Sequence, residues 1–133
     1  HRTSRRQRQM CIRDRVKVKS FFEEELSKPS QSEFIFSYEI NIKNVNSFPV
    51  KLLSRKWFVF DSKGEHYEVE GNGVIGKQPT INHNDFHSYE SGSSLTSPIG
   101  RMRGYYIMQN IITEEKFKVY IPEFDLIAPF VLN

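Results

Sequence analysis

The segment EFIFSYEINIKN, residues 33–44, constrains the fold more than any other part of this chain. Successive side chains of a β-strand point to opposite faces, whereas the side chains of an α-helix repeat every 3.6 residues. The apolar residues of this segment occur at strict two-residue spacing, at Phe34, Phe36, Tyr38, Ile40 and Ile42. The spacing therefore predicts a strand that buries one face in a core.

Similar short segments follow along the chain and are separated by turn residues, which is typical of antiparallel folds. The chain holds 11 Phe and 6 Tyr but a single Ala, Ala128, and this composition favours strands over helices. We expect Trp57 to anchor the core, with Phe58 and Phe60 on the opposite face of their strand. The sequence predicts an all-β fold of seven or eight strands, either an antiparallel two-sheet sandwich or a small barrel. The expected strands cover residues 16–22, 33–44, 50–61, 66–70, 86–92, 102–111, 115–122 and 124–132.

Charge divides the chain into two parts. Residues 1–19 carry eight basic residues and one acidic residue, whereas the rest carries 11 basic and 15 acidic residues. We expect residues 1–15 to form a basic arm and residues 16–133 to form one domain. The arm is either a disordered tail that touches nucleic acid or an acidic partner, or a segment foreign to the natural fold. The second interpretation is favoured because composition changes abruptly at Val16 and the later sequence needs nothing before it. The body of the domain has no basic cluster of the kind that binds nucleic acid.

The lack of long apolar runs and the single cysteine indicate the cellular compartment of the protein. No run approaches the roughly 18 apolar residues that span a bilayer, so membrane insertion is not expected. Charge at the N-terminus is not followed by an apolar stretch of the kind found in signal peptides. Cys11 is the only cysteine and has no partner for an internal disulfide. These features predict a soluble protein of a reducing compartment, the cytoplasm.

GNGVIG, residues 71–76, spells the G-x-G-x-x-G pattern of dinucleotide-binding proteins. That pattern needs a helix after its last glycine, because the helix N-terminus meets the pyrophosphate. Here Pro79 follows and no helical periodicity begins, so the dinucleotide fold is excluded. Two interpretations remain. The glycines bend a connection between strands, which is favoured, or they form an anion-binding nest for a phosphorylated nucleotide, the site being Gly71, Gly73, Gly76 and Lys77.

Other candidates for chemistry are few. His83, Asp85 and His87 have i, i+2, i+4 spacing and would suit Co²⁺, Ni²⁺ or Zn²⁺, although a solvated strand edge is the favoured interpretation. Arg55 lies between apolar neighbours and is expected to form an ion pair across the core or, alternatively, to face a ligand. No nucleophile and base stand at a spacing that indicates catalysis. We expect no enzyme activity and no cofactor.

Four separated motifs resemble the ApaG family in order and spacing, over about residues 16–133. They are PVKLLSRKW (49–57), GNGVIGKQP (71–79), YESGSSLTSPIGRMRGYY (89–106) and VYIPEFDLIAP (119–129). The resemblance implies an immunoglobulin-like or fibronectin-III-like β-sandwich. It also implies a small bacterial protein that is associated with cobalt and magnesium tolerance or efflux. The chain departs from the family at His83-Asn84-Asp85, where a Pro-Gly-acidic turn is usual, and at Lys77, where an acidic residue is usual. Asn84 still permits a left-handed turn.

Together these observations predict a non-enzymatic binding module that acts through contacts with an unidentified protein partner. Exposed strand edges offer one route to such a partner. Surface aromatics, expected at Tyr105, Tyr106 and Phe130, offer another. Gly100, Arg101, Arg103 and Gly104 are expected to flank a turn. A solvated basic turn is the favoured interpretation, and contact of the two arginines with an acidic partner is the alternative. The alternative function is a sensor that holds a nucleotide at GNGVIG, and a divalent cation is a further possible ligand.

Overall fold

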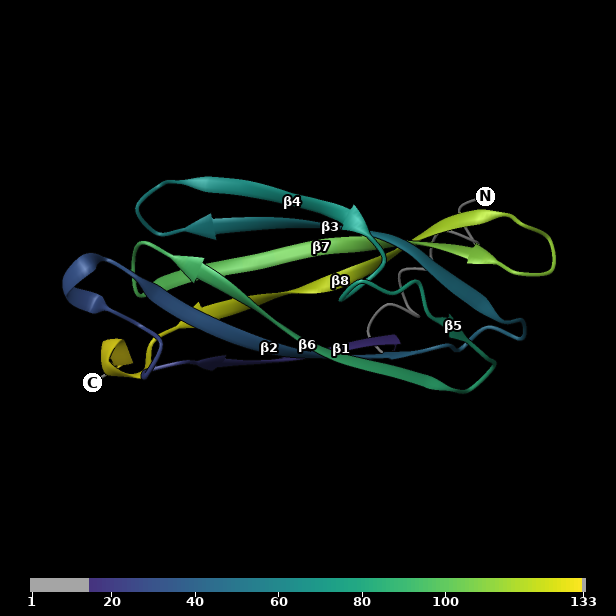
Figure 1. Cartoon of the computed structure of the whole chain (residues 1–133), viewed down its shortest axis with the longest axis horizontal. Helices are drawn as coiled ribbons and strands as arrows, with labels where there is room; N and C mark the ends of the chain where they lie inside the picture. Colours follow the sequence, from purple (N-terminus) through teal and green to yellow (C-terminus); the bar gives the residue numbers. More distant parts are fainter. Residues whose placement is uncertain (1–14, 133) are drawn as a thin grey trace.

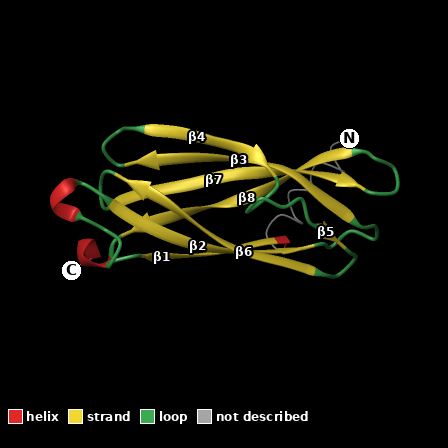
Figure 2. Cartoon of the chain, in the orientation of Figure 1, coloured by secondary structure: helices red, strands yellow, loops and turns green. Residues whose placement is uncertain are grey.

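The structure, a computed structural model, describes residues 15–132 and consists of two layers of β-strands (Figure 1). The predicted arm lies outside the described residues except for Arg15, whose side chain is buried and donates a hydrogen bond to the Asn46 Oδ1. Two short 3₁₀ helices, η1 (Pro29–Gln31) and η2 (Pro129–Leu132), lie at one end of the sandwich (Figure 2). No helix within residues 15–132 is long and apolar enough to cross a membrane. The strands are β1 (Val16–Phe22), β2 (Phe34–Lys43), β3 (Val50–Asp61), β4 (His66–Asn72), β5 (Thr80–Ile81), β6 (Phe86–Leu95), β7 (Ile99–Asn110) and β8 (Lys116–Ile127).

The strands form two antiparallel sheets, which confirms the predicted two-sheet sandwich. The smaller sheet has the order β1-β2-β6. The larger sheet has the order β4-β3-β7-β8, and the two-residue strand β5 also pairs with β3. All pairings are antiparallel, as the predicted alternation of short strands and turns requires.

The core lies between the sheets and is built from alternate residues of each strand. The five apolar residues predicted to face inward from β2, Phe34 to Ile42, are all buried. Trp57 from β3 is 2% exposed, and its ring packs 5.3 Å from that of Tyr38 and 5.9 Å from that of Phe124. Trp57 therefore joins the two sheets, as expected of a single core tryptophan.

The two sides of the sandwich differ. On one side β1 packs beside β8, and the Ser20 hydroxyl donates a hydrogen bond of 3.1 Å to the Asp125 carbonyl. On the other side β4 and β6 are the edge strands of their sheets. There the Tyr67 hydroxyl of β4 donates to the Ser94 carbonyl of β6 and lies 3.0 Å from the Ser93 hydroxyl. The second side therefore has free strand edges.

Some predicted boundaries were wrong. Residues 115–122 and 124–132 were predicted as two strands, but β8 is continuous from Lys116 to Ile127 and is followed by η2. Pro122 is accommodated because Pro122 and Glu123 lie opposite the single residue Arg103, so that β8 bulges where the missing N–H would have been needed. β6 likewise continues beyond the predicted strand end at Gly92 as far as Leu95.

Several orientations also differ from the prediction. The alternation of HYEVE would place Tyr67 and Val69 inside, but β4 is an edge strand and they are 41% and 37% exposed. Tyr106 was expected at the surface and is fully buried. Arg101 and Arg103 do not flank a turn, because both lie within β7 with exposed side chains.

Candidate functional site

The GNGVIG loop connects β4 to β5 by a tight turn. Gly73 and Gly76 have left-handed backbone, with φ of 62° and 71°, and Ile75 between them has φ of 48°. Val74 is buried and pairs with Lys77 through two backbone hydrogen bonds of 2.7 and 3.0 Å. These glycines therefore bend the chain, in agreement with the favoured interpretation.

Three amides of this loop are already used within the protein. The Gly73 N–H donates to the Leu53 carbonyl at 2.8 Å, and the amides of Val74 and Lys77 donate to each other's carbonyls. Leu53 is the extra residue of a bulge in β3, between the pairs Leu52–Met108 and Ser54–Ile107. The hydrogen bonds from Gly73 and from Gln78 Nε2 satisfy its carbonyl. An anion at this loop would have to be bound by other groups, such as the exposed side chain of Lys77.

Gly71 has a different role, which involves Arg55. The two residues are paired across β3 and β4. A Cβ atom at position 71 would lie 2.7 Å from Nη1 and 3.0 Å from Nη2 of Arg55, so the guanidinium lies against the bare glycine. Arg55 Nη1 donates to the Gly73 carbonyl at 2.9 Å and to the Asn72 carbonyl at 3.4 Å. The predicted ion pair was wrong, because Arg55 pairs with no carboxylate among residues 15–132.

The predicted metal ligands do not converge. His83 Nδ1 contacts the Asn46 carbonyl, and the Asp85 carboxylate accepts a hydrogen bond from the Phe86 amide. His87 lies on β6 with its ring 6.2 Å from that of Tyr89, and burial together with the charge of Lys77 lowers the pKa of this histidine. Residues 15–132 contain no group of three His, Cys, Asp or Glu side chains that could hold a metal ion. The neighbouring turn does survive as predicted, since Asn84 has φ of 63°.

The outer face of the larger sheet carries alternating rings and cations. Arg103 lies over both Phe58 and Phe60, at 5.5 and 5.4 Å from the ring centroids, and Lys118 lies 4.5 Å from the Tyr105 centroid. Rings of neighbouring strands also meet, with Phe58 and Tyr105 at 6.4 Å and Tyr105 and Tyr120 at 6.0 Å. We call this surface the aromatic–cation face; it comprises Lys56, Phe58, Phe60, Arg101, Arg103, Tyr105, Lys118 and Tyr120.

The cations of the aromatic–cation face differ in how closely they are paired with carboxylates. Lys56 is bound by Glu68 at 3.0 Å and Glu70 at 2.9 Å, and these two carboxylates raise the pKa of Lys56 well above its ordinary value. Arg101 reaches Glu123 only at 3.9 Å. Arg103 contacts rings and has no ion pair within residues 15–132. Arginine stacked on aromatic rings, with its charge unpaired, is typical of residues that dominate protein interfaces.

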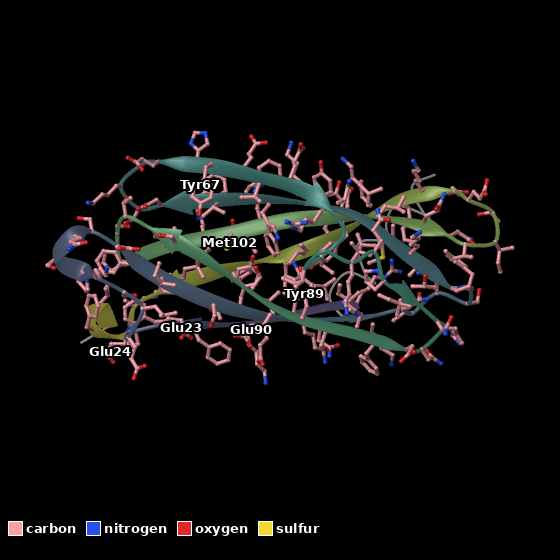
Figure 3. All side chains as sticks on the ribbon, in the orientation of Figure 1. Glu23, Glu24, Tyr67, Tyr89, Glu90 and Met102 are labelled. Carbon is pink, nitrogen blue, oxygen red and sulfur yellow. The ribbon has the colours of Figure 1, made fainter. Side chains whose placement is uncertain are left out.

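A second surface lies between the free edges of β4 and β6. This groove has a volume of about 220 Å³, and Figure 3 shows Tyr67 on β4 and Met102 deeper between the sheets. Trp57 and Arg55 also line it. Its β6 wall is formed by Ser91, Gly92, Ser93 and Ser94.

Only part of these two surfaces could be predicted from the sequence. The alternation of Trp57 with Phe58 predicted that Phe58 and Phe60 leave the core, and Tyr105 was singled out as a surface aromatic. The pairing of β7 with β3, which places Arg103 on those rings, has no local signal because it joins residues 39 to 60 positions apart. The contact between Arg55 and Gly71 likewise depends on strand pairing.

Comparisons with known proteins agree with this structure. The sequence model of the ApaG domain (DUF525) matches residues 24–110. The chain is 44% identical to Protein ApaG of Vibrio cholerae over 125 residues, which covers 92% of this chain and 95% of that protein. It is 39% identical to Protein ApaG of Photobacterium profundum, covering 87% of this chain and 91% of that protein.

Solved structures show the same fold. The crystal structure of the putative ApaA protein from Bordetella pertussis superposes with a TM-score of 0.82 at 38% identity, covering 86% of this chain and 92% of that chain. A protein from Archaeoglobus fulgidus, at 8% identity and a TM-score of 0.50, shares the fold alone and covers 84% of this chain and 95% of that one. From the matched domain and the similarity over nearly the whole chain, we conclude that this chain belongs to the ApaG family.

Proposed function

We propose that this chain is a non-enzymatic binding module of the cytoplasm that docks a protein partner on the aromatic–cation face. Its connection with cobalt and magnesium homeostasis, which the family resemblance implies, then runs through that partner. The observation that carries the proposal is Arg103, an exposed cation stacked on Phe58 and Phe60 without a carboxylate partner in the described part of the chain.

The composition of the face supports this function. Interfaces are enriched in Tyr, Phe and Arg, and these residues lose little conformational entropy on binding when neighbours already hold them in place. Tyr120 is 48% exposed and packs against Tyr105, so it offers apolar area beside a hydroxyl. A sheet face also holds its side chains more rigidly than a loop does.

The test compares two variants of the full chain that make equivalent changes on opposite sheets. Arg103→Glu with Tyr120→Ser reverses one charge and removes one exposed ring on the aromatic–cation face. Lys17→Glu with Phe86→Ser makes the same changes on the outer face of the smaller sheet, where both residues are exposed. Proteins captured by wild-type chain from a bacterial lysate are identified, and the purified candidates are then titrated calorimetrically.

We expect the first variant to bind the partner at least about tenfold more weakly and the second to bind it as wild type does. Equal binding by all three proteins would place the interface elsewhere. A titration with ATP tests the alternative function, in which a nucleotide binds at Gly71, Gly73, Gly76 and Lys77. That alternative predicts saturable shifts of the loop amides, which Lys77→Met weakens.

A further inference from the structure

Arg55 is placed unusually for a cation. It belongs to the inward-facing residues of β3, in the same register as Trp57 and Val59, yet it lies at the open side of the sandwich next to the edge strand β4. Its side chain is half-buried. Cations directed between two sheets are normally neutralised by a carboxylate, and residues 15–132 supply none here.

The protein holds one edge of this guanidinium and leaves the other edge without a partner. Nη1 is fixed by the carbonyls of Asn72 and Gly73, and the plane lies against Gly71. Nε and Nη2 have no hydrogen-bond partner among the described residues. These two nitrogens form the edge of an arginine that binds two oxygens in parallel.

The surroundings supply neutral donors and no competing anion. Arg55 lines the groove between β4 and β6 together with the hydroxyl-bearing residues Tyr38, Tyr67, Ser91 and Ser93. No acidic residue lines this groove. Its volume of about 220 Å³ has room for an acidic side chain or a small organic acid.

We propose that this groove binds a carboxylate, with Nε and Nη2 of Arg55 donating to its two oxygens and serine hydroxyls donating to its remaining lone pairs. A carboxylate is favoured over a phosphate because the groove offers one positive charge and one two-donor edge, which match a planar group of single charge. Gly71 then matters because it leaves space for the guanidinium. The carboxylate belongs either to a free organic acid or to an acidic residue of an extended peptide lying along β6.

The first experiment is a titration of ¹⁵N-labelled full chain with sodium succinate, followed by NMR of backbone amides and of the arginine Nε–H groups. We expect saturable shifts of the Arg55 Nε–H and of the amides of Gly71 and residues 91–94. Sodium chloride at equal ionic strength should not reproduce them. If the Arg55 Nε–H stays unmoved by succinate, or moves equally with chloride, the proposal is wrong.

Three variants test the assignment. Arg55→Met should weaken succinate binding at least about tenfold, because it removes the two-donor edge. Gly71→Ala keeps the charge but places a methyl group where the guanidinium lies, and should weaken binding similarly. Lys77→Met is the matched control, since it removes one charge from the adjacent loop and should leave the succinate Kd within about twofold. If Lys77→Met weakens binding as much as Arg55→Met, the ligand is bound at the loop and not in the groove. The wild-type titration decides the proposal if a variant fails to fold.

Two further probes define the ligand. Inorganic phosphate should bind more weakly than succinate, and tighter binding of phosphate would overturn the carboxylate class. An end-blocked peptide with a single Glu distinguishes the source. Additional shifts along the whole of β6, absent with succinate, assign the carboxylate to an extended peptide; identical shifts assign it to a free acid, and either result supports the site. Because the groove and the aromatic–cation face are separate surfaces, this proposal fails or succeeds independently of the docking function.

Discussion

Gly73 and Gly76 have similar backbone conformations but very different surroundings. Both have left-handed φ, which costs an L side chain roughly 1 kcal/mol or more. A Cβ atom at Gly73 would lie 1.9 Å from the Lys77 carbonyl oxygen, whereas a Cβ atom at Gly76 would meet nothing within 4 Å. The motif therefore contains one glycine required by close packing and one required only by φ.

This contrast predicts two different costs of substitution. Gly73→Ala should lower the free energy of unfolding by about 2–4 kcal/mol, because strain at φ adds to a displaced backbone. Gly76→Ala should lower it by only about 1 kcal/mol. Urea denaturation of both variants measures the difference. Equal losses would show that the turn relaxes and that close packing at Gly73 is unimportant.

Asp61 is the most strongly hydrogen-bonded carboxylate of the described chain and ties two turns together. Burial alone would raise its pKa, but hydrogen bonds from the hydroxyls of Ser97 and Thr96 and from the amides of Thr96 and Lys63 outweigh burial and lower the pKa to about 2. The carboxylate thus links the β3–β4 turn to the β6–β7 turn.

The depressed pKa predicts a pH dependence with a definite sign. An unfolded Asp has a pKa of about 3.9, so the ionised carboxylate contributes its full stability above about pH 5 and loses it as pH falls toward 2. Asp61→Asn should cost about 1–2 kcal/mol at pH 7, and the difference from wild type should shrink at pH 2.5. Urea titrations at the two pH values test this. A pH-independent difference would assign the cost to packing and not to charge.

At the scale of elements, the sheets are joined by a pair of tyrosines. The hydroxyls of Tyr89 on β6 and Tyr106 on β7 are hydrogen-bonded to each other, and burial raises the pKa of both. Both phenols therefore stay neutral at ordinary pH, and their bond is a structural link between the two layers.

A double-mutant cycle should detect this link. Tyr89→Phe and Tyr106→Phe should each cost about 1–2 kcal/mol, because each leaves the other hydroxyl without its partner. The double variant should cost less than the sum by about 1 kcal/mol. Thermal and urea unfolding of the four proteins give the coupling energy. Strict additivity would mean that water replaces either hydroxyl without loss.

A strand could be predicted from the sequence where the pattern that specifies it lies within the strand itself. β2 was predicted from its alternation alone, because one face is buried along its whole length. β8 was divided wrongly, because Pro122 ordinarily interrupts a strand and the bulge that accommodates it depends on Arg103 of a neighbouring strand. Of the candidate sites, the outward direction of Phe58 followed from its neighbours, whereas the unpaired state of Arg55 required the pairing of β3 with β4.

At the scale of the whole molecule, the sandwich is closed along one side and open along the other. β3 and β7 are paired on both of their edges, whereas β4 is paired on one edge and most of its side chains are exposed. The two proposed binding surfaces lie on different parts of this frame. The groove lies between the free edges of β4 and β6, and the aromatic–cation face is displayed by β3, β7 and β8 of the larger sheet.

The asymmetry predicts unequal local stability. Amides of β3 and β7 that form hydrogen bonds should exchange with solvent only on global unfolding, whereas those of β4 should exchange through local opening at a free energy lower by roughly 1–3 kcal/mol. Hydrogen exchange followed by NMR provides these values residue by residue. If succinate binds in the groove, adding it should slow the exchange of the β4 amides, because a ligand held by Arg55 and β6 stabilises the closed arrangement of the edge strands. The β7 amides should still exchange only on global unfolding. Protection of β4 equal to that of β7 without ligand would mean that β4 opens only together with the rest of the larger sheet, and that the free edge of β4 is as stable as the core.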